Sequence, residues 1–208
     1  MNNWGGGSNF YWHQMLTQKG YVVAVIDPRG TGARGEEFKK MTYRELGKYE
    51  SADHIESAKY LAGLDFVDSE RIGIWGWSYG GYMSSLAMFK GEGIFKAAIA
   101  VAPVTNWRFY DTIYTERYMD TPQNNANGYD DNSPTTHSEK LQGNYLLIHG
   151  TGDDNVHFQN AVALQNKLIA EGKQFDSFYY PDRSHGIYES NARPHLFNFM
   201  THWVLENL

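Results

Sequence analysis

A serine between two glycines is the residue best suited to do chemistry in this chain. Residues 76–80 read Gly-Trp-Ser-Tyr-Gly, with Ser78 at the centre of a Gly-x-Ser-x-Gly pattern. The pattern is typical of a sharp turn from strand to helix, where the serine hydroxyl projects above a sheet and glycines let the two backbones pass. The next backbone N–H, that of Tyr79, would then face a developing oxyanion. We therefore predict a nucleophile at Ser78 and an oxyanion donor at Tyr79.

A serine nucleophile needs a base that an acid orients. In a sheet of this kind the three residues follow one another as Ser, then Asp or Glu, then His. Asp153 and Asp154 follow one apolar run, and His185 follows the next one. All of them therefore follow the carboxyl ends of predicted strands, at the same edge of the sheet as Ser78. The spacing predicts His185 as the base and leaves Asp153 and Asp154 open as the acid.

The remaining histidines and the absence of cysteine argue against a metal centre. His149 lies at a strand end before the acid, so we expect it to be packed or hydrogen-bonded. No His-Glu-x-x-His or similar ligand spacing occurs, and without cysteine there is no thiolate ligand or disulfide. We predict neither a metal nor another cofactor.

Apolar runs that alternate with helical patterns must position these residues. Strands are predicted at 21–26, 71–77, 95–101, 145–148 and 175–180, and helices at 10–18, 49–64, 80–89, 159–171 and 194–208. This alternation predicts an α/β protein with a mostly parallel sheet and helices on both faces. Segment 121–138, rich in Asn and Asp, is predicted to be a surface excursion. The length of 208 residues favours a single domain over 1–208.

Composition narrows the function classes. There are 18 Lys and Arg against 24 Asp and Glu, a net charge of −6, so we expect no nucleic-acid partner. The apolar runs are far shorter than the roughly 20 residues of a membrane-spanning helix, so we expect no transmembrane segment in this chain. Aromatic residues make up 15% of the chain, which favours an aromatic wall around a ligand or interface.

Six motifs resemble the prolyl oligopeptidase family of serine peptidases, and the similarity spans nearly all of the chain. The motifs are Asp27–Gly32 (DPRGTG), Gly76–Tyr82 (GWSYGGY), Val101–Val104 (VAPV), Tyr114–Met119 (YTERYM), His149–Phe158 (HGTGDDNVHF) and Ser184–Gly186 (SHG). The resemblance implies an α/β-hydrolase fold and a triad of Ser78, Asp153 and His185, which selects the first aspartate. It also implies a peptide substrate, from which N-terminal X-Pro or X-Ala dipeptides are released through an acyl-enzyme. The alternatives are tripeptide release, a carboxylesterase, and a non-catalytic interaction module.

The resemblance also implies a proline pocket. The positions that match it are Tyr79, Val104, Trp107, Tyr110, Tyr114 and Val156. An aromatic box suits a pyrrolidine ring, which offers no N–H and is selected by shape and apolar contact. Asn155 is implied to hold the substrate carbonyl beside the pocket. The alternative for Trp107, Tyr110 and Tyr114, which stand at helical spacing, is that they are core residues.

Three features of the family have no counterpart in this sequence. They are a tyrosine upstream of the first helix that supplies a second oxyanion donor, a β-propeller with paired glutamates, and a strand that would lie between residues 21–27 and 71–77. We therefore expect an N-terminally truncated fragment of a larger polypeptide, weakly active when isolated, whose sheet has a gap or pairs two strands abnormally. The resemblance further implies a homodimer formed through residues 194–208, and a location at the cell envelope, in the periplasm or outside the cell.

Overall fold

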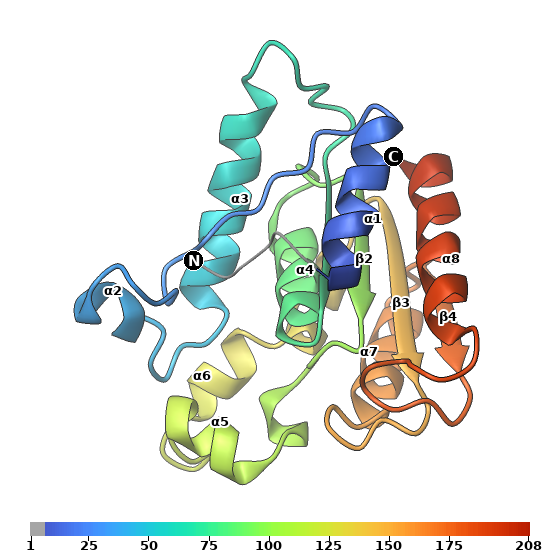
Figure 1. The fold of residues 1–208 in the computed structure, drawn as a ribbon. Coiled ribbons are helices and arrows are strands. Elements are labelled where there is room, and N and C mark those ends of the chain that lie inside the picture. Colours follow the sequence, from blue (N-terminus) through green and yellow to red (C-terminus); the bar gives the residue numbers. More distant parts are fainter. Residues whose placement is uncertain (1–6) are drawn as a thin grey trace.

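The computed structural model describes residues 7–208 and contains one parallel sheet of four strands (Figure 1). The strands lie in chain order across the sheet: β1 (Gly73–Trp77), β2 (Ala97–Val101), β3 (Asn144–Gly150) and β4 (Asp176–Tyr180). All three neighbouring pairs are parallel, and their registers align Trp77 with Val101 and Val101 with Ile148. The carboxyl ends of the strands therefore meet at one edge of the sheet. The predicted parallel sheet is confirmed.

Helices cover both faces of this sheet, as predicted. One face carries α1 (Gly7–Gln18) and α8 (Ala192–Asn207), and the other carries α3 (Lys48–Ala62), α4 (Tyr79–Lys90) and α7 (Gln159–Ala170) (Figure 1). Alternate strand residues supply two separate cores. Ile99 and Leu146 pack toward α1 and α8, whereas Ala98 and Leu147 pack toward α3, α4 and α7. Burial on both faces explains why these strands are continuous apolar runs in the sequence.

The strand predicted at residues 21–26 is wrong. The structure leaves this segment outside the sheet, with Val22 and Val25 64% and 58% exposed. Its β-branched residues favour a strand, but a strand forms only where a neighbour accepts and donates its backbone hydrogen bonds. Within residues 7–208 no segment lies beside it as a partner, so it runs as extended coil. The sheet described for residues 7–208 ends at β1.

The chain between β2 and β3 is folded into short helices above the carboxyl edge of the sheet. They are η1 (Trp107–Phe109), α5 (Thr112–Met119), α6 (Ala126–Asp131), η2 (Pro134–Thr136) and η3 (Ser138–Lys140). The predicted surface excursion at 121–138 is partly wrong, because Tyr129 and Ser133 are buried. The Tyr129 hydroxyl donates to the Asp120 carbonyl at 2.7 Å, and the Ser133 hydroxyl donates to the Thr105 carbonyl at 2.5 Å. These bonds attach the segment to the body of the domain.

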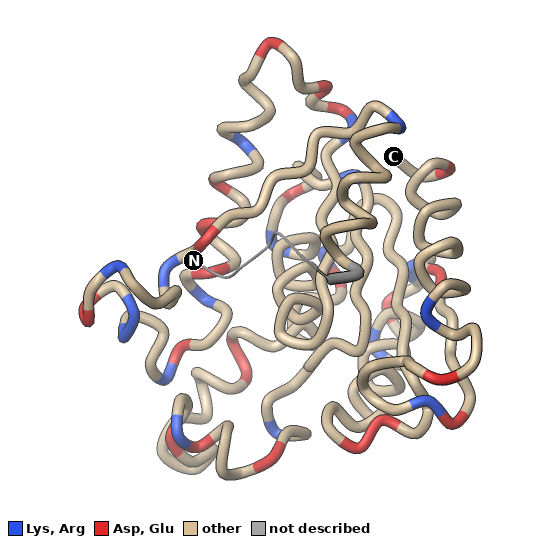
Figure 2. Tube along the Cα trace, viewed as in Figure 1, with Lys and Arg blue, Asp and Glu red and all other residues tan. Residues whose placement is uncertain are grey.

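Lys, Arg, Asp and Glu lie on the helices and loops, with Asp176 at the start of β4, and the two central strands β2 and β3 carry none (Figure 2). Opposite charges are close together along α3 and along α2 (Glu36–Lys40), where Lys59 pairs with Glu56 and Lys40 with Glu36. Among the helices described for residues 7–208, none combines the length and apolar character needed to cross a bilayer.

Candidate active site

Ser78 occupies a strained turn between β1 and α4. Its backbone has φ 59° and ψ −119°, a conformation that costs a non-glycine residue about 1–3 kcal/mol. The Ser78 N–H donates to the Val101 carbonyl at 2.8 Å, and the Tyr82 N–H donates to the Ser78 carbonyl at 3.0 Å. The adjoining strand and helix thus hold the turn from both sides. This is the strand-to-helix geometry that the Gly-x-Ser-x-Gly pattern predicts.

The glycines around Ser78 have different roles. A Cβ placed on Gly76 would lie 2.1 Å from the Gly80 carbonyl oxygen, so no other residue fits at position 76. A Cβ on Gly80 would meet nothing within 4 Å, so the prediction that Gly80 must also lack a side chain is wrong. Instead Gly81 is restricted, because a Cβ there would lie 2.9 Å from the Val101 carbonyl. The helix crosses β1 at Gly76 and β2 at Gly81.

The backbone N–H of Tyr79 is available as an oxyanion donor. Tyr79 is the first residue of α4, where an N–H has no carbonyl one turn earlier in the helix to bond. None of the hydrogen bonds within residues 7–208 uses this N–H. The positive end of the helix dipole adds to its attraction for a negative oxygen beside Ser78.

Asp153 and His185 meet at the carboxyl edge of the sheet. Asp153 is buried in the turn after β3, where the backbone N–H groups of Asn155 and Val156 donate to its Oδ1 at 3.0 and 2.9 Å. His185 lies in the loop after β4, and its Nδ1 is 2.7 Å from Asp153 Oδ2. Asp154 is exposed. Of the two aspartates that the spacing left open, Asp153 is therefore the one that contacts the base.

Asp153 remains ionised beside His185. Burial alone would raise the pKa of Asp153, but hydrogen bonds from His149 and His185, the charge of His185 and the Asn155 N–H together lower it below its ordinary value. An ionised carboxylate can only accept, so His185 carries a proton on Nδ1. The Nε2 atom of a neutral His185 is then left with a lone pair, as a general base requires.

The loop that carries His185 is fastened to the residue before Ser78. The Trp77 indole donates to the His185 carbonyl at 3.0 Å, and the neighbouring Ile187 is completely buried. Four non-glycine residues of this loop have positive φ, namely Asp182, Ile187, Glu189 and Ser190. The hydrogen bonds of residues 7–208 do not include one between the Ser78 hydroxyl and the His185 imidazole. In free enzymes this contact is often long and shortens only when substrate is bound.

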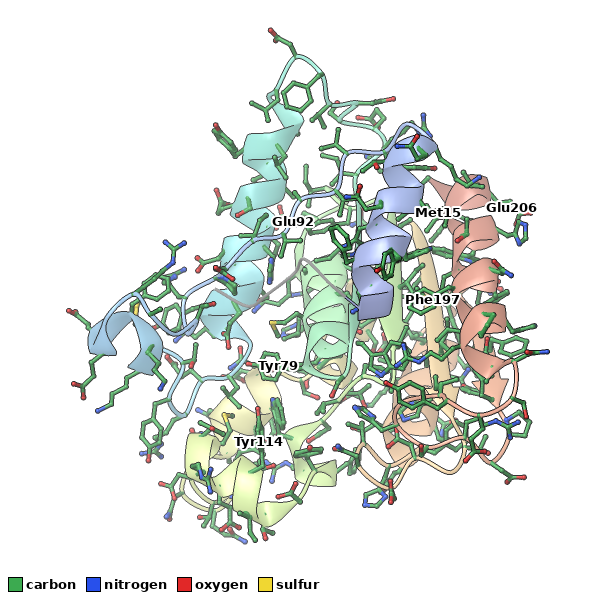
Figure 3. The ribbon with its side chains drawn as sticks, viewed as in Figure 1. Met15, Tyr79, Glu92, Tyr114, Phe197 and Glu206 are labelled. Atoms are coloured by element: carbon green, nitrogen blue, oxygen red, sulfur yellow. The ribbon has the colours of Figure 1, made fainter. Side chains whose placement is uncertain are left out.

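The six predicted pocket residues form one aromatic and aliphatic cluster beside Ser78. The cluster holds Val104, Trp107 and Val156 at its buried base, with Tyr79, Tyr110 and Tyr114 partly buried against it. Trp107 stacks on Tyr114 at a centroid distance of 5.8 Å and lies 5.7 Å from the Tyr79 ring. Figure 3 shows Tyr79 and Tyr114 on two neighbouring elements, Tyr79 on α4 and Tyr114 on α5. Trp107, Tyr110 and Tyr114 span η1 and α5, so their helical spacing does not reflect one continuous helix.

Asn155 lies at the rim of this cluster. The Tyr110 hydroxyl donates to Asn155 Oδ1 at 2.6 Å. The side-chain Nδ2 has no partner among the hydrogen bonds of the described residues, so it remains free to donate. An amide donor at this rim fits the predicted contact with a substrate carbonyl.

Glu50 supports the pocket from below, and the sequence analysis did not single it out. The Tyr79 hydroxyl donates to Glu50 Oε1 at 2.6 Å, and the Gly47 N–H donates to Glu50 Oε2 at 3.0 Å. Glu50 is 5% exposed, and burial raises its pKa although these hydrogen bonds oppose the shift. Burial and the charge of Glu50 together raise the pKa of Tyr79 well above its usual range. A glutamate in the first turn of a predicted helix favours a capping interaction, but nothing in the sequence connects Glu50 to Tyr79.

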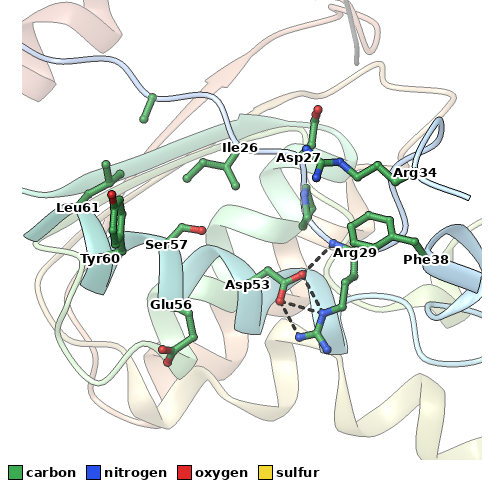
Figure 4. Close-up of a pocket in the computed structure, with 12 residues that line it drawn as sticks. Ile26, Asp27, Arg29, Arg34, Phe38, Asp53, Glu56, Ser57, Tyr60 and Leu61 are labelled. Carbon is green, nitrogen blue, oxygen red and sulfur yellow. Dashed lines mark hydrogen bonds and ion pairs between the residues drawn. The ribbon is translucent and has the colours of Figure 1, made fainter.

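A separate solvent-open hollow of about 660 Å³ lies between segment 24–29 and α3 (Figure 4). There the backbone N–H of Arg29 donates to Asp53 at 2.8 Å, and the Arg29 guanidinium donates to the same carboxylate at 2.6 Å. The ion pair attaches the DPRGTG motif to α3. None of the predicted site residues lines this hollow.

A parallel sheet with a serine at a strand-to-helix turn, and an Asp–His pair beyond the later strands, defines an α/β-hydrolase. The chain belongs to the prolyl oligopeptidase family, whose model matches residues 8–208. The family membership and fold predicted from the sequence are therefore confirmed.

The similar proteins include several peptidases. Bovine dipeptidyl peptidase 4 is 42% identical over 193 residues, which cover 91% of this chain and 25% of the relative. Mouse prolyl endopeptidase FAP has the same identity and coverage, and a probable dipeptidyl-aminopeptidase B of Grosmannia clavigera is 46% identical over 189 residues, which cover 89% of this chain and 19% of the relative. The crystal structure of Porphyromonas gingivalis dipeptidyl peptidase 4 matches with a TM-score of 0.93 and 50% identity over 95% of this chain and 28% of that one. The chain thus spans about a quarter of the length of most of these proteins.

Proposed function

We propose that this chain is the catalytic domain of a serine exopeptidase of the dipeptidyl peptidase IV type, which releases X-Pro or X-Ala dipeptides from peptide N-termini. The observation that carries the proposal is the Asp153–His185 pair, with Nδ1 2.7 Å from Oδ2, on a loop fastened to the residue before Ser78. Similarity to dipeptidyl peptidases supports the substrate class.

In the proposed reaction His185 takes the Ser78 proton while the serine oxygen attacks the scissile carbonyl. Asp153 keeps the His185 proton on Nδ1 and stabilises the imidazolium that forms. The Tyr79 N–H donates to the oxyanion. Removal of one such donor typically raises the activation barrier by about 2.7–4 kcal/mol. The amine leaves with the proton from His185, and water then hydrolyses the acyl-enzyme.

The aromatic cluster supplies the selectivity. A proline ring would lie among Tyr79, Trp107, Tyr110 and Tyr114, with its ring carbons in apolar contact and no N–H left unpaired. Asn155 Nδ2 would donate to the preceding carbonyl of the substrate. A proline bound in this way would place the scissile bond directly after it, and the proposed dipeptide release makes that proline the second residue of the peptide.

We further propose that residues 1–208 form one catalytic domain within a longer polypeptide, which acts as a homodimer in the periplasm or outside the cell. The coverage of the relatives supports the first part, since the matched region is 25% of bovine dipeptidyl peptidase 4. The location and the dimer rest on the family resemblance alone. Size-exclusion chromatography with light scattering of the protein at native length, that is, of the whole longer polypeptide, tests the dimer.

Hydrolysis of a Gly-Pro anilide, compared with that of a short p-nitrophenyl ester, tests the activity. We expect the protein at native length to prefer the anilide, and Ser78→Ala to abolish both turnover and labelling by an organophosphonate. Preference for the ester would favour the carboxylesterase, and no labelling of the parent would favour the non-catalytic module. Residues 1–208 alone are expected to turn over slowly, and a rate equal to that at native length would contradict this.

A further inference from the structure

One buried imidazole beside the proposed acid has no role in the reaction described so far. His149 lies at the end of β3 with 0% of its surface exposed, and its ring packs edge-on against Phe158 at 5.7 Å. Its Nε2 is 2.8 Å from the Val156 carbonyl oxygen and 3.3 Å from Asp153 Oδ2. Its Nδ1 is buried and has no hydrogen-bond partner among the described residues.

These contacts determine the protonation of the ring. A carbonyl and an ionised carboxylate both accept and neither can donate, so Nε2 must carry a proton. A second proton on Nδ1 would place a charge in the interior with no acceptor, which is unfavourable. His149 is therefore a neutral imidazole that donates from Nε2.

The single Nε2–H of His149 is shared between the Val156 carbonyl, which is the shorter contact, and the Asp153 carboxylate, so both oxygens of Asp153 face donors. Oδ2 of Asp153 faces His185 Nδ1 at 2.7 Å and His149 Nε2 at 3.3 Å, while Oδ1 accepts from the Asn155 and Val156 N–H groups. Val156 closes a small ring of bonds, because its N–H donates to Asp153 and its carbonyl accepts from His149. Rotation of the carboxylate would break several of these bonds at once.

We propose that His149 is a positioning residue for the reaction, whose Nε2–H fixes the Asp153 carboxylate in the orientation that receives His185 Nδ1–H and shares its negative charge. This inference rests on the proposed function, because it assigns a second partner to the same acid. The titratable groups around Asp153 are His149 on β3, His185 on the loop after β4 and, more distant, Tyr110 before α5.

Loss of the His149 donor should shift the pH profile of the reaction in one predictable direction. Without it, more negative charge on Asp153 faces His185, and the imidazolium form of His185 is favoured. The acid limb of the pH profile of kcat/KM then moves to higher pH. Because His149 is buried and does not reach the substrate, kcat falls while KM stays close to that of the parent.

The test compares three variants of the protein at native length with a Gly-Pro anilide. His149→Leu removes the donor, His149→Gln returns an amide N–H near the Nε2 position, and Phe158→Leu loosens the packing of the ring but keeps the donor. We expect His149→Leu to lower kcat about tenfold and to move the acid limb upward by about one pH unit, the effect of one hydrogen bond to a charged group. His149→Gln restores most of both, and Phe158→Leu leaves the limb in place.

Two results would overturn the proposal. One is a folded His149→Leu variant whose acid limb coincides with that of the parent. The other needs no variant: nitrogen-15 NMR of the parent that places the His149 proton on Nδ1. If the parent does not cleave the anilide, the proposed substrate class fails, and the tautomer together with the pH dependence of organophosphonate labelling at Ser78 still decides the role of His149.

Discussion

Two adjacent aspartates with the same chemistry have different surroundings. The Asp153 side chain turns inward and receives donors from the backbone and from imidazole rings, whereas Asp154 is exposed. Spacing alone could not separate them, because the direction of each side chain depends on a turn whose geometry no local pattern encodes. The family motif selected Asp153, and the same residue lies beside His185 in the structure.

This difference predicts opposite outcomes for two equivalent substitutions. Asp153→Asn would offer an amide N–H to His185 Nδ1 and favour the wrong tautomer, so kcat should fall by about 10⁴-fold. Asp154→Asn should leave kcat within about twofold of the parent, since an exposed carboxylate without a catalytic contact contributes little. Steady-state rates with the Gly-Pro anilide provide the comparison. Equal losses in the two variants would show that the acid has been misassigned.

At the scale of elements, the turn between β1 and α4 depends on one glycine more than on the other. Gly76→Ala would force a Cβ to 2.1 Å from the Gly80 carbonyl, whereas Gly80→Ala meets nothing within 4 Å. We expect Gly76→Ala to destabilise the fold by about 3 kcal/mol and to abolish labelling of Ser78, and Gly80→Ala to retain both. Urea unfolding and phosphonate labelling measure the two effects. A Gly80→Ala variant that is as unstable as Gly76→Ala would contradict the assignment.

The predictability of each element follows from where its hydrogen bonds go. Strands β2 and β3 were found from apolar runs because both faces of the central sheet are covered by helices. Segment 21–26 has a similar composition but no neighbour within residues 7–208, so a correct local signal gave a wrong strand. Segment 121–138 was misjudged because its polar residues bond inward to the backbone, as the Tyr129 hydroxyl does. Glu50 was missed because its contact with Tyr79 joins separate helices.

Hydrogen exchange of residues 1–208 checks this account of the elements. Amides of segment 21–26 should exchange rapidly, since only the Tyr21 N–H, which donates to the Leu16 carbonyl at 3.2 Å, has a described backbone partner. Amides of β2 and β3 should exchange only through global unfolding. Protection of segment 21–26 equal to that of β2 would show that it is paired in solution.

For the whole molecule, one carboxyl group links the pocket to stability. Glu50 lies between the start of α3 and Tyr79 on α4, so its charge is enclosed where two helices and the aromatic cluster meet. The same burial that raises the pKa of Glu50 makes its ionised form costly in the folded state. Glu50 holds Tyr79 in the wall of the pocket, and its burial makes the folded state less stable at pH values above the raised pKa of Glu50.

The pH dependence of unfolding tests this last point. The folded pKa of Glu50 lies above the unfolded value of about 4.3. Between these two pKa values the folded state keeps a proton that the unfolded state has lost, so the contribution of Glu50 to stability falls as pH rises through that interval.

Glu50→Gln carries no titrating proton. We expect the variant to be less stable than the parent by about 1 kcal/mol at low pH, through poorer bonds to Gly47 and Tyr79, and the difference to shrink as pH rises. Thermal unfolding across the interval measures it, with exposed Glu56→Gln on the same helix as the matched control. A difference between Glu50→Gln and the parent that stays constant with pH would mean that Glu50 titrates in the folded protein as it does in the unfolded chain.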